Sequence, residues 1–185
     1  MNNDLAVDDE SLKSLLKKHV NILRRDDINP DDENVKDIDG KQAIVDLMLY
    51  RRFPHKIPES FEHLVVELKR PACKLGEAEL SQIEKYGITV AKDERFHGAN
   101  VAWKFLLVGN ELNEFATEKC DIQNREFGHT YASRNGLINI HVTTWATIIN
   151  EAKWRYQFLQ KELKLRLTAD ESLAYLHEKY SDLFS

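Results

Sequence analysis

Residues 63–69 read His-Leu-Val-Val-Glu-Leu-Lys, and this short stretch decides the fold that we expect for the chain. The stretch is apolar and β-branched, and Pro71 stops it, which predicts a strand of a buried sheet. Side chains alternate between the two faces of a strand, so Glu67 and Lys69 point to one side and Leu68 to the other. Because a lone charge is costly to bury, both charged side chains need partners nearby.

A second apolar run, over residues 43–50, is interrupted once by an acid, Asp46. It predicts another strand, and residues 51–62, with two prolines, are expected to form a polar loop between the two strands. Where the strands are neighbours, Asp46 lies near Glu67. Two close carboxylates repel each other unless they share a cation, and oxygen ligands suit Mg²⁺ or Mn²⁺. A lysine beside such a metal can orient a water and offset charge on a phosphate, as hydrolysis of a phosphodiester requires.

The Glu-x-Lys spacing alone is weak evidence, since it occurs at 67–69, 151–153 and 162–164. The two later copies lie in polar segments of helical periodicity, where both charges reach water. Only the first copy lies in an apolar strand. A purely structural cluster of ion pairs remains the alternative to a metal site there.

The rest of the sequence alternates helical and extended patterns. Ser11 is expected to cap a helix with an apolar stripe from Leu12 to Leu23. Further helices are expected over 76–92, 111–120, from 145 onward and over 170–180, and further strands over 101–108 and 137–142. This order predicts an α/β fold with a central mixed β-sheet flanked by helices. The apolar stripe through Trp145 and Tyr156 is expected to belong to the core, with a dimer seam as the alternative.

Charge is distributed unevenly along the 185 residues, whose net charge is −5. Residues 1–40 hold 6 basic and 11 acidic side chains, and the remaining residues hold 20 of each. We therefore divide the chain into an N-terminal helix with an acidic connector (1–40) and a neutral domain with C-terminal helices (41–185). The neutral region carries no net repulsion toward phosphate, so a nucleic-acid substrate is compatible with it.

Several classes of protein are excluded by missing features. The sequence has no apolar run long enough to cross a membrane, and no secretory signal, so a cytoplasmic location is expected. Its two cysteines, Cys73 and Cys120, are expected to be free thiols. The seven histidines are scattered, and no phosphate-binding loop, dinucleotide fingerprint, serine-hydrolase elbow or zinc spacing is present.

The residues resemble a known superfamily. Ile44-Val45-Asp46 and the later Val65-Val66-Glu67-Leu68-Lys69, with 20 residues between the acids Asp46 and Glu67, are similar to the signature of the PD-(D/E)xK nucleases. Gln82 and Tyr86 on the following helical stretch resemble the glutamine and tyrosine of some branches. The resemblance covers roughly residues 42–165 and extends to Shedu-type defence nuclease domains and to nuclease domains that follow Hsp90/histidine-kinase-like ATPases. The proline of the superfamily's name is replaced by Val45, which removes no ligand.

The resemblance implies a restriction-endonuclease-like core of α-β-β-β-α-β order and a Mg²⁺-dependent DNA endonuclease, with Mn²⁺ as a substitute. Asp46 and Glu67 would bind the metal with the Leu68 carbonyl, Lys69 would position the attacking water, and Gln82 would orient the water or Lys69. Such a protein would be a module of a bacterial anti-phage or restriction system.

Contacts with DNA are expected from the locally basic residues 51–74, with RNA as another substrate that the sequence allows. The candidate contacts are Arg51, Arg52, Arg70, Lys74 and Tyr86. Expected partners are a fused or separate ATPase or sensor module and further copies in a homodimer or higher oligomer. The alternative function is a catalytically silent nuclease-like domain that binds nucleic acid or supports oligomerisation.

Overall fold

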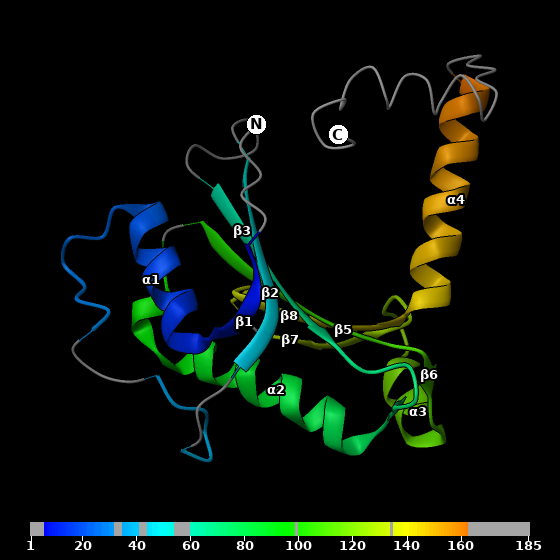
Figure 1. Cartoon of the computed structure of the whole chain (residues 1–185), viewed down its shortest axis with the longest axis horizontal. Coiled ribbons are helices and arrows are strands. Elements are labelled where there is room, and N and C mark those ends of the chain that lie inside the picture. The colour runs from blue at the N-terminus through cyan, green and yellow to red at the C-terminus, as the bar shows by residue number, and fades with distance from the viewer. Residues whose placement is uncertain are drawn as a thin grey trace, which may run out of the picture. The chain divides into compact units, whose positions relative to one another are not determined.

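A computed structural model describes residues 6–31, 35–40, 44–53, 60–98, 100–133 and 135–162. For residues 6–10, 48, 50–53 and 162 it describes the backbone only. The helix expected over 170–180 lies outside the described residues. The larger elements, shown in Figure 1, are β1 (Ala6–Ser11), α1 (Leu12–Leu23), β2 (Ile44–Phe53), β3 (Ser60–Leu68), α2 (Glu77–Lys92), β5 (Val101–Gly109), β8 (Ile138–Thr144) and α4 (Trp145–Glu162). The shorter ones are β4 (Lys74–Leu75), η1 (Glu94–Phe96), β6 (Glu111–Leu112), α3 (Glu114–Cys120) and β7 (His129–Ala132).

The described residues form an α/β protein with a central mixed sheet, which confirms the expected fold class. Its six strands lie in the order β1-β2-β3-β5-β8-β7. Strand β5 runs parallel to both β3 and β8, whereas the other neighbours are antiparallel. The elements from α1 to β5 do read α-β-β-β-α-β along the chain. The third strand of that series, the two-residue β4, however, pairs with β6 in a separate small sheet instead of joining the central one.

Helices α1 and α2 form where the sequence predicts them. The Ser11 side chain accepts a hydrogen bond from the amide of Ser14 at 3.2 Å, which satisfies one of the free amides at the start of α1. At the start of α2, the Glu79 carboxylate accepts from the Gly76 amide at 3.0 Å. Both helices bury their apolar stripes against the same face of the sheet, which forms the main core (Figure 1). This shared face positions the polar side chains described below.

The loop expected over residues 51–62 is wrong at its two ends, since residues 51–53 and 60–62 belong to strands. Strand β2 continues to Phe53 and β3 begins at Ser60, and the Phe53–Ser60 pair closes an antiparallel hairpin. The two prolines that suggested a loop, Pro54 and Pro58, both fall between these strand ends, outside the described residues. Arg51 of β2 pairs with Glu62 of β3 across the hairpin. Polar residues can form strand pairs of this kind, and the pattern of apolar residues alone does not reveal them.

Helix α3 starts later than expected. Residues 111–112 are the short strand β6, and Asn113 then caps the helix, its side chain accepting from the amide of Ala116 at 2.9 Å. An asparagine cap of this kind was the signal for the true helix start.

The described residues fall into two compact units, one up to Trp145 and the other from Ala146 onward. Within the first unit, Val35 and the buried face of α1 belong to the same apolar core as the sheet. The division of the chain at residue 40 stays a prediction.

Helix α4 belongs, from Ala146 onward, to the second unit, which is described by itself. Its large side chains are exposed: Trp145 by 39%, Tyr156 by 53% and Trp154 by 70%. The core packing expected for the stripe through Trp145 and Tyr156, and the dimer seam given as its alternative, stay predictions.

No helix in the described ranges is long and apolar enough to span a bilayer.

Candidate active site

The first predicted site residue, Asp46, reaches the end of β3. One of its carboxylate oxygens, Oδ2, accepts a hydrogen bond from the Leu68 amide at 2.5 Å. Glu10 of β1 pairs with Val45, the residue directly before Asp46 on β2, and β2 pairs in turn with β3, so three neighbouring strands lie side by side here. The structure thus places Asp46 against the Glu67–Leu68 peptide, as the sequence predicts.

Glu67, Lys69 and Gln82 form one hydrogen-bonded cluster. The ammonium of Lys69 donates to Glu67 Oε1 at 2.9 Å and to Gln82 Oε1 at 2.8 Å. The Gln82 amide nitrogen donates to the same Glu67 oxygen at 3.2 Å. Glu67 is only 6% exposed, whereas the Lys69 side chain is 19% exposed. The Lys69 ammonium and the Gln82 amide both contact this deeply buried carboxylate, which offsets the cost of removing it from water.

Tyr86 extends the cluster along α2. Its hydroxyl accepts from the Gln82 amide nitrogen at 2.6 Å, one helical turn away. Since that nitrogen faces both Tyr86 and Glu67, the amide oxygen of Gln82 is turned toward Lys69. Burial raises the pKa of the Tyr86 phenol, and the nearby Glu67 charge acts in the same direction, so the phenol stays neutral. Tyr86 is 5% exposed, and packing against the sheet accounts for most of its surface.

The donor set fits a hard divalent cation by its chemistry. Asp46, Glu67 and the Leu68 carbonyl offer oxygen atoms only, which is the preference of Mg²⁺ and Mn²⁺. Among the described residues, no group of three or more His, Cys, Asp or Glu side chains gathers at one place, so no site richer in side-chain ligands competes with it. The fit rests on two carboxylates and one carbonyl.

Several basic side chains in and near the predicted nucleic-acid surface form ion pairs with carboxylates. Lys74 is paired with Glu111 at 2.8 Å, and Arg70 lies in the exposed turn after β3. Two further basic residues near this region, Arg95 and Lys104, are paired with Asp93 and Glu62. The side chains of Arg51 and Arg52 are outside the described ones. Phosphate would therefore compete with carboxylates for several of these cations.

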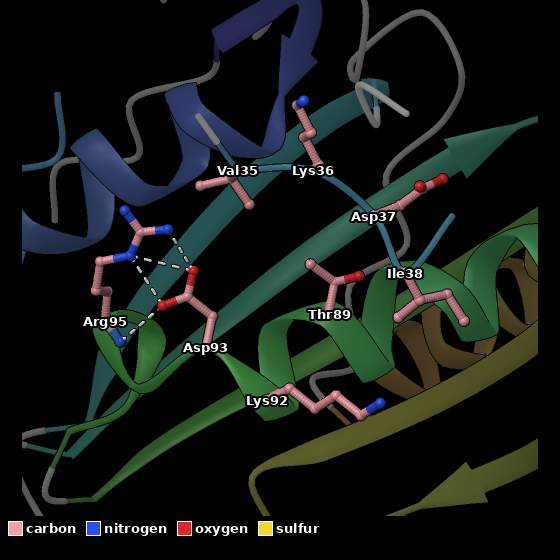
Figure 2. A pocket seen from close by; sticks show the side chains of 8 residues that line it. All are labelled: Val35, Lys36, Asp37, Ile38, Thr89, Lys92, Asp93 and Arg95. Atoms are coloured by element: carbon pink, nitrogen blue, oxygen red, sulfur yellow. Dashed lines mark hydrogen bonds and ion pairs between the residues drawn. The ribbon is translucent and has the colours of Figure 1, made fainter. Parts of the chain in front are cut away.

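A pocket of about 320 Å³ lies beside the C-terminal half of α2, but none of the predicted site residues lines it (Figure 2). Its walls come from residues 35–38, from Thr89 and Lys92, and from η1. Figure 2 shows the Arg95 guanidinium held by Asp93 at its rim. Burial alone would raise the pKa of Asp93, and the hydrogen bond from Arg95 overcomes this and lowers it. Of the three cationic residues that line the pocket, Lys36, Lys92 and Arg95, the last is paired with Asp93, and we assign no ligand to this pocket.

A second buried polar pair, His19 and His63, was missed by the sequence reasoning. Nδ1 of His19, on α1, lies 3.0 Å from Nε2 of His63, on β3, and both side chains are fully buried. Trp103 of β5 stacks on His63 with ring centroids 4.2 Å apart. Burial lowers the pKa of His19 from 6.5 to about 4 and that of His63 to about 3. The available signal was a histidine inside the apolar stripe of a helix and another inside an apolar strand.

Comparison with known proteins adds no assignment: no family model, curated protein or solved structure matches this chain. The site therefore has to be judged on its own geometry.

Proposed function

We propose that the chain is a Mg²⁺-dependent DNA endonuclease that hydrolyses phosphodiester bonds, as a module of a bacterial anti-phage or restriction system. The observation that carries this proposal is the cluster at the end of β3, where Lys69 and Gln82 converge on the buried Glu67 carboxylate. Asp46, from the neighbouring strand, contacts the same stretch of backbone. These are the four residues that carry the resemblance to PD-(D/E)xK nucleases.

In this proposal, each residue has a separate task. Asp46, Glu67 and the Leu68 carbonyl would hold the metal, which when bound supplies Lewis-acid stabilisation of the phosphate oxygens. The Lys69 ammonium is partly exposed, so it can orient a water beside the scissile phosphate and offset the developing negative charge. Gln82 keeps Lys69 in place, because its amide oxygen accepts from the ammonium.

The reaction is a one-step hydrolysis. The water oxygen forms a bond to phosphorus while the bond between phosphorus and the 3′ oxygen breaks. The water loses a proton to solvent, and the leaving 3′ oxygen gains one. The products are a 5′-phosphate and a 3′-hydroxyl.

Plasmid cleavage with Mg²⁺ or Mn²⁺, and with EDTA, tests the proposal. We expect Asp46→Ala, Glu67→Ala and Lys69→Ala each to reduce cleavage by at least about a hundredfold, since each removes charge stabilisation of the transition state. Glu118→Ala and Lys119→Ala are matched controls, because these residues are exposed on α3. Cleavage that survives all three site substitutions would overturn the assignment. A companion assay with single-stranded RNA determines whether RNA is also cut.

One observation favours a second candidate, a catalytically silent domain that binds nucleic acid or supports oligomerisation. Lys69 already contacts the Glu67 carboxylate in an ion pair at 2.9 Å, so a cation offsets the charge of this carboxylate without a metal. Calorimetric titration with Mn²⁺ separates the two candidates. Binding that is lost in Asp46→Asn supports the nuclease, whereas no binding to the wild-type protein supports the silent domain.

A further inference from the structure

Helix α4 exposes large apolar side chains on two sides. Trp154 and Phe158 are 70% and 62% exposed, the highest values among the large hydrophobic residues of the described chain. They are four residues apart and therefore share one side of the helix. Ile149, Tyr156 and Leu159, which are 49–53% exposed, lie on the other side. A helix that is apolar on both sides is stable only when other elements cover it.

The side with Trp154 and Phe158 also carries an ordered pair of charges. Glu151 lies three residues before Trp154, and Lys161 lies three residues after Phe158. The four side chains fall within one stripe of the helix, because spacings of three and four residues keep a common side. Read in either direction, their spacing is three, four and three residues, with an acid at one end and a base at the other.

This spacing is what an isologous interface requires. When two copies of α4 lie antiparallel with their centres aligned, Trp154 of each copy faces Phe158 of the other. The same alignment brings Glu151 of each copy to Lys161 of the other, so that two aromatic contacts and two ion pairs repeat about one two-fold axis. A partner of unrelated sequence places no such symmetry requirement on the helix.

From this arrangement, we propose that a second copy of this chain docks antiparallel on the Trp154–Phe158 side of α4. The interface has an aromatic centre and charged ends, which is the usual arrangement of a protein interface. Glu151 is paired loosely with Arg155 of its own helix at 3.4 Å, in an exposed contact that docking can replace. The inference does not depend on nuclease activity, because it uses no residue of the candidate active site.

The full chain, studied by sedimentation equilibrium between about 1 and 100 µM, tests the proposal, since weak self-association is measurable in this range. We expect dimers in the wild type. Trp154→Ala is expected to raise the dissociation constant at least about thirtyfold, as for a tryptophan at the centre of an interface. Glu151→Lys and Lys161→Glu are each expected to raise it about tenfold, because each places like charges opposite one another. None of these exposed residues belongs to the core, and far-ultraviolet circular dichroism verifies folding.

Two charge-swap experiments test the antiparallel alignment itself. The double variant Glu151→Lys/Lys161→Glu restores both ion pairs and is expected to dimerise like the wild type. An equimolar mixture of the two single variants is expected to form heterodimers. A wild type that stays monomeric at every concentration overturns the proposal, as do charge variants that leave dimerisation unchanged. A parallel pairing predicts this last outcome, because Glu151 would face Glu151 and its replacement would exchange one repulsion for another.

Discussion

Strand β3 carries two buried polar clusters that solve the same physical problem in opposite ways. His63 contacts His19 of α1. Glu67, four residues further along the same face of the strand, contacts Lys69 and also Gln82 of α2. The histidine pair avoids charge, since burial lowers both pKa values and both rings are neutral at pH 7. The Glu67 cluster instead brings a cation to the carboxylate. A neutral pair suits structural packing, whereas a carboxylate beside an ammonium group at a strand end suits chemistry.

Among the substitutions that test this comparison, Lys69→Met is expected to lower the stability of the protein the most. It removes the cation that contacts the buried Glu67 carboxylate at 2.9 Å, and the free energy of unfolding is expected to fall by about 3 kcal/mol. The double variant Glu67→Gln/Lys69→Met removes both charges and is expected to recover most of that loss. Urea denaturation at pH 7 measures both variants.

The matched control is Lys119→Met, at an exposed position of α3, which is expected to change stability by less than about 0.5 kcal/mol. If Lys69→Met costs no more than this control, Lys69 does not compensate the Glu67 charge.

The next largest effect is expected from lowering the pH, which should destabilise the fold through the histidine pair. Each folded-state pKa lies below the unfolded value of 6.5, so protonation favours the unfolded chain. The stabilisation is complete above pH 6.5 and is lost as the pH falls toward about 4. Between pH 7 and pH 5 we expect a loss of roughly 2–4 kcal/mol, from urea midpoints at a series of pH values.

The double variant His19→Leu/His63→Leu isolates this effect, because other groups also titrate in acid. Its stability is expected to change much less between pH 7 and pH 5. An equally steep dependence in this variant would place the acid sensitivity outside the histidine pair.

Gln82→Leu is expected to have a smaller effect. It removes one hydrogen bond each from Lys69, Glu67 and Tyr86 but leaves the ion pair, so we expect a loss of about 2 kcal/mol. Thermal unfolding compares it with Gln123→Leu, an exposed loop substitution. Equal melting temperatures for the two variants would mean that the amide contributes nothing to holding the cluster.

The smallest effect is expected from Tyr86→Phe. The Gln82 amide still donates to Glu67 when the hydroxyl is removed, so the loss is expected to stay near 1 kcal/mol. Tyr156→Phe, on exposed α4, is the comparison in the same denaturation series. A loss as large as that of Gln82→Leu would show that Tyr86 determines the orientation of the amide.

Sequence reasoning succeeded where local pattern and burial agree. Ser11 and the apolar stripe after it predicted α1, and Glu67 in an apolar strand predicted that charged partners would gather there. It failed for residues 51–53 and 60–62, where polar strand residues paired in a hairpin lack apolar alternation. For α4, a helical stripe indicates that one side of the helix is covered but does not contain the identity of the element that covers it.

The histidine pair marks another limit. His19 and His63 are 44 positions apart, and each is ambiguous by itself. Only the approach of α1 to β3, decided by the packing of the whole core, turns two isolated polar residues into one pair. A one-dimensional pattern contains no distance between them.

The stacking of Trp103 on His63 has a consequence for optical measurements. Trp103 is fully buried, whereas the other two tryptophans, Trp145 and Trp154, are exposed by 39% and 70%. The emission spectrum of the protein should therefore contain a blue component from the core and a red component from α4. The blue component is sensitive to the His63 ring on which Trp103 stacks, and the red component is sensitive to the solvent exposure of α4. A single fluorescence measurement can thus follow the buried histidines and the surroundings of α4 in the same sample.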